Sequence, residues 1–311
     1  MHDHHTRHRH GTAARGRRSA LRALAAAGAL AAAASCTAPG AGPDGGADAS
    51  PSPSPSAAPE PVVRADLEEV FDAAGITGTF ALLDTGSGEL TVVEPEMAAE
   101  RAAPASTFKI ANSLIALDAG AVADVDEVVP FTGGPQPNPE WEHDMSMREA
   151  LPISAYPIFQ ELARRVGPEE MAARVEQFGY GNADIGGPDD IDSFWLEGPL
   201  AISAVEQVRF VSDVVTGGLP VDPAHVDAVR PLLRDDELSA EGGPTVYGKT
   251  GWSDKVDPDV GWFVGWVDDG SAAPHAFALR IDMDDDGDVE QRRPLTEELL
   301  TRLGVLPPSG S

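Results

Sequence analysis

The sequence predicts an α+β fold with α-β-α layering, in which strands from both ends of the chain form one antiparallel sheet. Two runs of alternating apolar residues flank a Thr-Gly-Ser-Gly turn within 78–95, and three further strand-like runs (TVYGKTGWS, GWFVGWVDD and HAFALRIDM) lie within 245–283. The long segment between these two groups is helical or loop-rich, which predicts a helical lobe beside the sheet. We therefore expect a cleft where sheet and lobe meet.

The elements begin with an opening helix. The segment RADLEEVFDAAG, 64–75, has early acidic residues and apolar residues at helical spacing, and Gly75 predicts its end. The two runs in 78–95 predict a hairpin because turn residues separate them. A further helix is expected at the PASTFK segment, and PLTEELLTRLG, 294–304, predicts a closing amphipathic helix.

Composition divides the chain into three parts. Residues 1–36 combine a basic start with the apolar run LRALAAAGALAAAAS, which is too short and too rich in alanine for a stable membrane span and predicts an export signal. Residues 37–61 are rich in Pro, Ser, Gly and Ala and predict a disordered, semi-extended tether. The domain itself is expected over 62–308, a length that fits a single domain.

The leader leaves two alternatives open. Arg17 and Arg18 directly before the apolar run suit the twin-arginine export route, although paired arginines also occur in leaders of the general secretory route. Cys36, the only cysteine, ends an Ala-Ala-Ser-Cys stretch that looks like a lipoprotein cleavage site. The protein is therefore expected outside the cell, either fully secreted or held at the membrane only through a lipid on Cys36. In either case the domain has no disulfide.

Charge and histidine placement argue against several functions. The formal net charge of −29 opposes binding to nucleic acid or to an anionic membrane, because like charges repel. His143, His225 and His275 are too widely spaced for a zinc hydrolase. The segment 282–287 begins like a calcium loop, but its twelfth position is Arg293 where a glutamate is needed. No metal is expected.

The first chemical signal is a lysine inside a core helix. Apolar residues recur at helical spacing through PASTFKIANSL, 104–114, so Lys109 is expected to be buried. Ser106 precedes it by one helical turn, and the two side chains are expected to meet. Burial lowers the pKa of a lysine and makes a neutral amine available as a base for the serine hydroxyl. When the Ser-x-x-Lys pattern occurs alone, its lysine more often reaches solvent.

A second signal makes the functional interpretation the better one. Lys249-Thr250-Gly251 lies on a predicted strand near the end of the chain. Ser-x-x-Lys followed by Lys-Thr-Gly is the pattern of penicillin-recognising serine enzymes. In that arrangement a glycine lets the strand approach the nucleophile closely, and the lysine and threonine bind the carboxylate of the substrate.

Longer segments resemble the class D β-lactamases, the oxacillinase type of serine β-lactamase. The similarity runs from Asp66 to Leu306 and rests on PASTFKIANSLIALDAG, SAYPIFQELARRVG, FGYGNADIG, FWLEGPLAISAVEQVRF, YGKTGW and GWFVGWV, in the family's order and approximate spacing. The resemblance implies the β-lactamase/transpeptidase-like fold. It also implies a hydrolase that opens penicillin-type β-lactams by forming and hydrolysing an acyl-enzyme.

The resemblance implies roles for single residues as well. Ser106 becomes the acylated nucleophile and Lys109 the general base, with its amine carboxylated by carbon dioxide or bicarbonate and no other cofactor. Ser154 relays a proton to the leaving nitrogen, and the indole N–H of Trp195 steadies the carbamate. The substrate-carboxylate side comprises Lys249, Thr250, Gly251 and Arg292, with Arg293 competing for the place of Arg292. The oxyanion hole is formed by the backbone N–H groups of Ser106 and Trp252.

One position departs from the family's pattern. The serine element is usually Ser-x-Val, whereas this chain has Ser154-Ala155-Tyr156. A tyrosine either points away from Lys109 or changes the polarity and access of its pocket, which puts carboxylation in doubt. An alternative therefore stays open, a penicillin-binding sensor that acylates but deacylates slowly, and a cell-wall transpeptidase or carboxypeptidase is a third hypothesis. The range of β-lactams, including carbapenems, and the oligomeric state stay open too.

Overall fold

The computed structural model describes residues 60–239, 241–255, 258–284 and 287–308. The expected leader, Cys36 and the tether up to residue 59 lie outside the described residues. The residues that are described belong to one compact unit. None of its helices within these ranges has both the length and the apolar character needed to cross a membrane.

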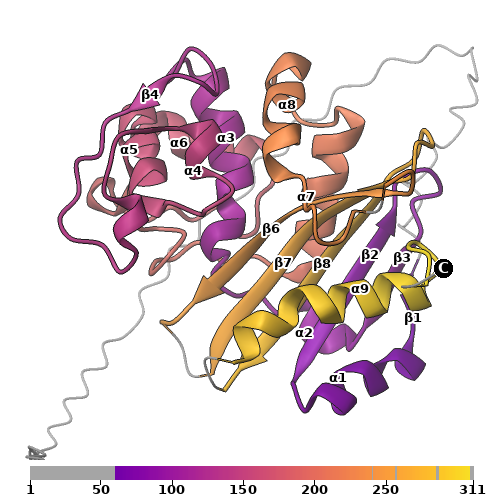
Figure 1. Ribbon diagram of the computed structural model, residues 1–311. Coiled ribbons are helices and arrows are strands. Elements are labelled where there is room, and N and C mark those ends of the chain that lie inside the picture. The colour runs from indigo at the N-terminus through magenta and orange to yellow at the C-terminus, as the bar shows by residue number, and fades with distance from the viewer. Residues whose placement is uncertain (1–59, 240, 256–257, 285–286, 309–311) are drawn as a thin grey trace, which may run out of the picture. The chain divides into compact units, whose positions relative to one another are not determined.

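A six-stranded sheet with the order β1-β3-β2-β8-β7-β6 lies at the centre of the described residues (Figure 1). Its strands are β1 (Val62–Val63), β2 (Gly78–Asp84), β3 (Leu90–Val93), β6 (Thr245–Ser253), β7 (Asp259–Asp268) and β8 (His275–Met283). The two ends of the chain meet where β2 pairs antiparallel with β8, and this confirms the predicted sheet. One correction is needed, because β1 pairs parallel with β3. Two residues are too few to show the alternation that predicts a strand.

Alternate residues of the strands enter two separate cores, one on each face of the sheet. On β7, Trp262 and Val264 join the core shared with the lobe, whereas Phe263 joins the other core, as the period of two requires. The helix α7 (Ala204–Thr216) packs on the lobe side, and α1 (Glu68–Ala74) and α9 (Arg292–Arg302) cover the opposite face (Figure 1). The α-β-α layering and the opening and closing helices are confirmed.

The helical lobe is inserted between β3 and β6. Its helices are α3 (Lys109–Asp118), α4 (Met147–Ala150), α5 (Tyr156–Val166), α6 (Pro168–Gln177) and α8 (Pro223–Val229), with a short pair β4 (Val128–Val129) and β5 (Met145–Ser146) and the 3₁₀ turns η2 (Ala105–Phe108) and η3 (Pro139–Trp141). The short helix α2 (Pro95–Ala99) packs instead on β2 and α7. All residues of α3 from Lys109 to Leu117 are buried, so this helix is the centre of the lobe.

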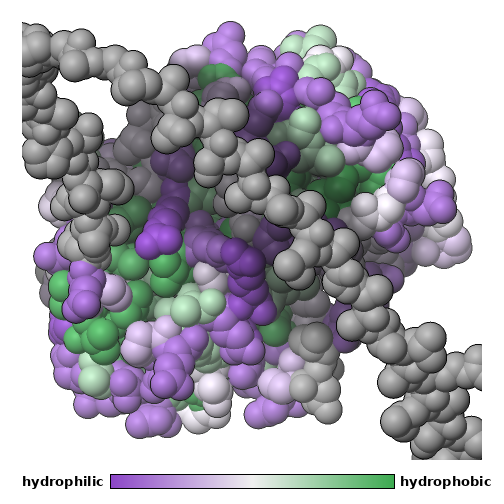
Figure 2. Space-filling view, turned by 180° about the vertical axis from the view of Figure 1, so that it is seen from behind, coloured by the Kyte–Doolittle hydropathy of each residue, from purple (hydrophilic) through white to green (hydrophobic). Residues whose placement is uncertain are grey.

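The surface exposes large hydrophobic side chains at Ile153 and Trp252, among a small set of described positions. These two residues adjoin Ser154 and Gly251 in the chain, so apolar surface is available beside the expected site. Figure 2 shows the face opposite that of Figure 1, where hydrophilic residues surround separate hydrophobic patches.

Candidate active site

Ser106 and Lys109 meet at the junction of η2 and α3. The Lys109 side chain is fully buried, Ser106 is half-buried, and Lys109 Nζ lies 2.5 Å from Ser106 Oγ. The predicted contact is confirmed, although the turn that carries Ser106 is 3₁₀ and not α-helical. Side chains three residues apart eclipse one another in a 3₁₀ turn, which brings these two groups together.

The Lys109 amine lies in surroundings that disfavour its charged form. Burial, and secondarily the positive charge of Lys249, hold the pKa of Lys109 well below its usual range. The ring of Phe159 lies 5.6 Å from the amine and forms part of its surroundings. An uncharged amine at hydrogen-bond distance can take the proton of the Ser106 hydroxyl.

The residue before the nucleophile is held in an unusual conformation. Ala105 has a φ of 48°, in the left-handed region that side chains other than glycine disfavour, at a cost of about 1–3 kcal/mol. Its backbone N–H donates to the carbonyl oxygen of Trp195 at 2.9 Å. The loop of Trp195 therefore supports the turn that presents Ser106.

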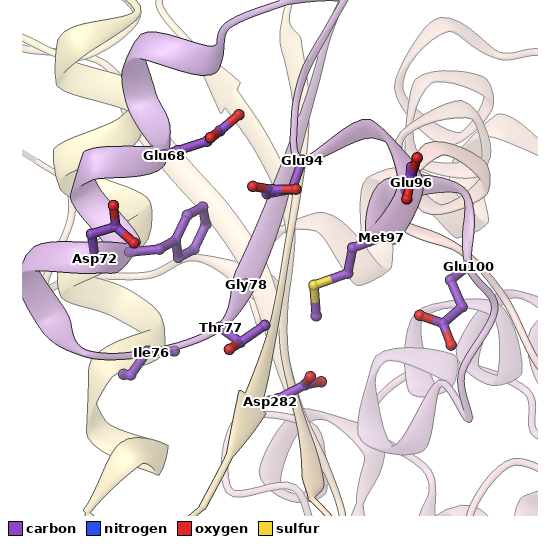
Figure 3. Close-up of a pocket in the computed structure, with 11 residues that line it drawn as sticks. Glu68, Asp72, Ile76, Thr77, Gly78, Glu94, Glu96, Met97, Glu100 and Asp282 are labelled. Carbon is purple, nitrogen blue, oxygen red and sulfur yellow. The ribbon is translucent and has the colours of Figure 1, made fainter.

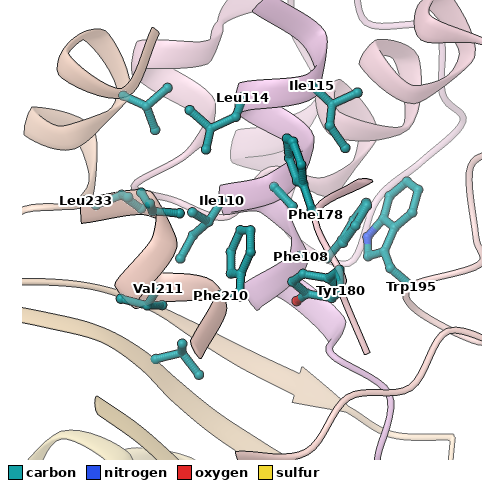
Figure 4. Packing of buried hydrophobic residues seen from close by; sticks show 14 of the residues in the cluster. Phe108, Ile110, Leu114, Ile115, Phe178, Tyr180, Trp195, Phe210, Val211 and Leu233 are labelled. Atoms are coloured by element: carbon teal, nitrogen blue, oxygen red, sulfur yellow. The ribbon is translucent and has the colours of Figure 1, made fainter. Parts of the chain in front are cut away.

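Trp195 is fully buried against the same turn. Its indole stacks on the ring of Phe108, with 5.6 Å between ring centroids, and Figure 4 shows it at the edge of the core cluster. Its Nε1–H has no hydrogen-bond partner within the described ranges. An unpaired buried donor is costly, so this N–H is available for a further acceptor.

Ser154 stands on the lobe side of Lys109. It lies in the turn before α5 with a φ of 60°, again in the left-handed region, and its Oγ is 3.3 Å from Lys109 Nζ. Lys109 thus lies between two hydroxyl groups, and a proton can pass from one to the other through the amine.

Tyr180, Gly181 and Asn182 form a structural turn. Asn182 Nδ2 donates to the carbonyl oxygen of Pro199 at 2.7 Å, and its Oδ1 accepts from Ala201 N at 3.0 Å. A Cβ added at Gly181 would lie 2.2 Å from Ala201 O, so only glycine fits there. Burial raises the pKa of Tyr180, which keeps its hydroxyl protonated.

Lys249 lies on β6 with its side chain buried, and its Nζ donates to Thr250 O at 3.0 Å. Burial, followed by the charges of Arg292 and Arg293, lowers the pKa of Lys249 to about 7. The side chain is therefore partly charged near neutral pH, and an anion placed beside it would favour the charged form.

Gly251 is the point where β6 approaches the nucleophile turn. A Cβ at this position would lie 3.0 Å from Pro104 O and 3.1 Å from Thr107 Cγ2, which confirms the close approach expected of this glycine. Trp252 follows with 46% of its surface exposed, and its Nε1 donates to Asp259 Oδ2 at 2.7 Å.

The two neighbouring arginines have different partners. Arg292 Nη1 donates to Gly251 O at 2.7 Å, so this side chain reaches β6, and burial lowers its pKa to about 10. Arg293 Nε donates instead to Asp235 Oδ2 at 2.7 Å. Arg292 thus lies at Gly251, whereas Arg293 lines the cavity beside Lys249 and Thr250, so the assignment of Arg292 to the substrate's carboxylate stays a prediction.

The Tyr156 ring packs on Trp141. The two rings meet edge to face with 5.2 Å between centroids, and Trp141 Nε1 donates to Ile153 O at 3.1 Å. Of the two possibilities that the sequence leaves for Tyr156, these contacts favour a ring directed to Trp141, with Phe159 beside the Lys109 amine.

A cavity of about 230 Å³ lies where lobe and sheet meet. Leu151 and Pro152 line it from the lobe, and Lys249 and Thr250 line it from β6. Asp235 and Arg293 line it too, whereas Ser106, Lys109 and Ser154 are not among its lining residues. The cavity therefore lies beside the two residues expected to meet the substrate's carboxylate, next to the nucleophile and not around it.

A second pocket, of about 590 Å³, is lined by none of the predicted site residues. It lies between α1 and α2, where the carboxylates of Glu68 and Glu94 point into it from two sides (Figure 3). Burial and the neighbouring charge of Glu68 raise the pKa of Glu94. Its chemistry is acidic and unrelated to the serine and lysine groups above.

Three residues near the site were not predicted from the sequence. Two of them could have been found, since Phe159 continues the apolar face of α5 and Gln207 is a polar side chain on the buried face of α7. Trp141 could not, because it lies in an irregular segment far from Ser154 in sequence.

Comparisons with known proteins agree with this arrangement. Residues 78–301 match the penicillin binding protein transpeptidase domain. The chain is 36% identical over 241 residues to β-lactamase OXA-5 from Pseudomonas aeruginosa, covering 76% of this chain and 87% of that protein. The crystal structure of class D β-lactamase YbXI from Nostoc superimposes with a TM-score of 0.74 at 33% identity, over 78% of this chain and all of that one. The crystal structure of FUS-1 (OXA-85), a class D β-lactamase from Fusobacterium nucleatum subsp. polymorphum, superimposes with a TM-score of 0.72 at 33% identity, over 77% of this chain and 98% of that one.

The sheet, the lobe and the Ser-x-x-Lys and Lys-Thr-Gly elements define the class of serine proteins that recognise penicillins. Within that class, the chain belongs to the class D β-lactamase family, as the identities and coverages above show. The resemblance seen in the sequence is thereby confirmed.

Proposed function

We propose that this protein hydrolyses penicillin-type β-lactams through an acyl-enzyme on Ser106. Its relatives are named β-lactamases and share its fold. One observation carries the proposal: the buried amine of Lys109, with its lowered pKa, lies 2.5 Å from Ser106 Oγ. A base at that distance is what a serine hydroxyl needs in order to attack an amide carbonyl.

Acylation begins when Ser106 Oγ bonds to the lactam carbonyl carbon and its proton passes to the Lys109 side chain. The carbon–nitrogen bond of the ring then breaks. The leaving nitrogen receives a proton from Ser154 Oγ, which is replaced from Lys109 across the 3.3 Å that separates them. The products of this half-reaction are an ester on Ser106 and an amine on the opened ring.

Two backbone N–H groups stabilise the negative charge that develops on the carbonyl oxygen. We assign them to Ser106 and Trp252, which lie on the two segments that approach each other at Gly251. Removing one donor of such a pair typically lowers the rate by about 100- to 1,000-fold.

The carboxylate of the substrate is assigned to the basic side of the cleft. Lys249 and Thr250 line the cavity, and Arg292 reaches the same strand through its bond to Gly251 O. Charge-assisted hydrogen bonds of this kind orient the lactam carbonyl over Ser106.

Deacylation requires the same base a second time. Water attacks the ester carbonyl and gives its proton to the Lys109 side chain, and Ser106 Oγ leaves with that proton. We propose that carbon dioxide or bicarbonate carboxylates Lys109, because burial lowers the pKa of the amine, and that the unpaired Trp195 Nε1–H donates to the carbamate. The carbamate supplies a negatively charged base that suits both half-reactions.

Turnover tests the proposal. Purified protein is incubated with benzylpenicillin and bicarbonate, ring opening is followed by absorbance, and Ser106→Ala is the matched control. We expect many equivalents of product from the wild type and none from the control. A single equivalent followed by a stable adduct on Ser106 would instead support the sensor hypothesis, and absence of any adduct would reject both.

The leader supports a proposal about location. We propose that the protein is exported by the secretory or twin-arginine route and is lipid-anchored through Cys36. Expression of the full chain and of Cys36→Ser, followed by fractionation, tests the anchor. We expect the wild type in the membrane fraction and the variant in the medium, and equal distribution of both would reject lipidation.

A further inference from the structure

A chain of buried hydrogen bonds converges on the residue that follows the nucleophile. Gln207 Nε2 donates to Thr107 Oγ1 at 2.9 Å, and Thr107 Oγ1 donates to Pro104 O at 2.7 Å. Thr107 and Gln207 are each 1% exposed. The hydroxyl has a single proton and uses it on Pro104, so its acceptor side serves Gln207 and both of these contacts are satisfied.

The opposite side of the same turn faces β6. Pro104 O and Thr107 Cγ2 are the atoms that a Cβ at Gly251 would meet, at 3.0 and 3.1 Å. Pro104 O also accepts from Thr107 N at 3.1 Å. The Thr107 hydroxyl therefore holds Pro104 O, which is one of the turn atoms nearest to β6.

Gln207 is anchored independently of the site. It lies in the second turn of α7, whose start has a capping box between Ser203 and Glu206. Glu206 also pairs with Arg101, in the segment that leads to the nucleophile turn. A rigid helix start thus presents the Gln207 amide to Thr107.

We propose that Thr107 and Gln207 are positioning residues that set the spacing of the oxyanion hole. The two N–H groups assigned to that hole belong to Ser106 and Trp252, which adjoin Thr107 and Gly251 in the chain. Donors must lie 2.7–3.1 Å from the oxyanion to stabilise it. Because both side chains are buried, neither touches the substrate. The inference rests on the proposed acyl-enzyme on Ser106 and adds the residues that tune it.

Matched variants at one position separate the two contacts. Thr107→Val keeps the methyl group that faces Gly251 and removes the hydroxyl, whereas Thr107→Ser keeps the hydroxyl. Gln207→Met removes the donor that fixes the hydroxyl from the other side. We expect Thr107→Val and Gln207→Met to lower the acylation rate constant about tenfold, because small misplacements of catalytic groups already cost rate. Thr107→Ser should stay within about threefold of the wild type, since it retains the hydrogen bonds.

Affinity for phenylboronic acid is the second readout. A boronate on Ser106 is tetrahedral and places an oxygen in the oxyanion hole, so its affinity should fall in parallel with acylation. The dissociation constant of the non-covalent penicillin complex should change less than about twofold. The acylation rate constant of the double variant should fall no further than that of the more impaired single variant, since both substitutions break the same hydrogen-bonded pair.

The outcomes distinguish the inference from the function on which it rests. If the wild type does not acylate, the proposed function fails. If the wild type acylates and Thr107→Val acylates equally fast, or acylates slowly with unchanged boronate affinity, the positioning role is wrong and the function stands. Thermal denaturation of each variant checks folding. A Thr107→Val variant that acylates slowly but has the melting temperature of the wild type supports the inference.

Discussion

Lys109 Nζ lies 2.5 Å from Ser106 Oγ in a pocket from which water is excluded around the lysine. The contact joins the second residue of the 3₁₀ turn to the first residue of α3, so its length depends on backbone geometry as well as on the lysine side chain. Burial and basicity are coupled here, because the same environment that hides the amine lowers its pKa.

The Trp195 indole N–H should determine how readily Lys109 is carboxylated. We expect Trp195→Phe to need about 10- to 100-fold more bicarbonate for full activity, since a hydrogen bond to a charged group contributes about 1.5–3 kcal/mol. Activity against bicarbonate concentration and the ¹³C signal of the carbamate measure it. Trp266→Phe is the matched control, because Trp266 is another buried indole without a partner among the described residues. Equal bicarbonate requirements in both variants would contradict the role of Trp195.

Substrate binding should weaken as the pH rises through the pKa of Lys249. That pKa is lowered to about 7, so the free protein loses this positive charge above neutral pH and attracts the penicillin carboxylate less. We expect KM to rise above pH 7 while kcat changes little, and binding to take up a proton. Lys249→Arg should flatten the profile because a guanidinium stays charged. A profile that Lys249→Arg leaves unchanged would assign the titration to another group.

Substitutions of the two arginines of α9 should have different effects. Arg292→Ala should raise KM about 10-fold or more with little effect on kcat, because it removes a charge beside Gly251. Arg293→Ala should leave KM unchanged and lower the melting temperature by about 2–4 °C, the effect of losing roughly 1 kcal/mol. Its partner Asp235 is buried, with 4% of the side chain exposed. The reverse pattern would make Arg293 the substrate residue.

Tyr156 and Phe159 should affect different properties. The Tyr156 ring packs on Trp141, so Tyr156→Val should leave the bicarbonate requirement within about twofold of the wild type. Phe159 lies beside the amine, and Phe159→Leu admits water, which raises the pKa of Lys109. The acid limb of the activity profile should then move to higher pH, because the amine must lose its proton before it can be carboxylated. Measurement of kcat against pH for both variants checks this contrast, and Tyr156→Val shifting the limb would contradict it.

Much of the fold was predictable because its elements carry strong periodic patterns. The strands β2, β7 and β8 alternate or run apolar between turn residues, and Gly75 ends its helix with a φ of 70°. The parallel strand β1 was not, since pairing between Val62–Val63 and β3 leaves no trace in so short a segment.

Within the site, contacts between residues close in sequence could be predicted, whereas contacts between distant residues could not. Ser106 and Lys109 are three residues apart, so helical geometry alone brings them together. Gln207 and Thr107 are separated by a hundred positions, and only the folded chain shows their contact. The direction of Tyr156 depended on Trp141, a partner that tertiary packing supplies.

The pairing of β2 with β8 also governs when this protein can finish folding. Gly78 pairs with Ile281, so the central sheet cannot form until the chain has been synthesised beyond Ile281. Long-range pairing of this kind slows folding, because a large loop must close before its contacts form. Because β6 joins this sheet through β7 and β8, the approach of Gly251 to the nucleophile turn is a late contact in folding.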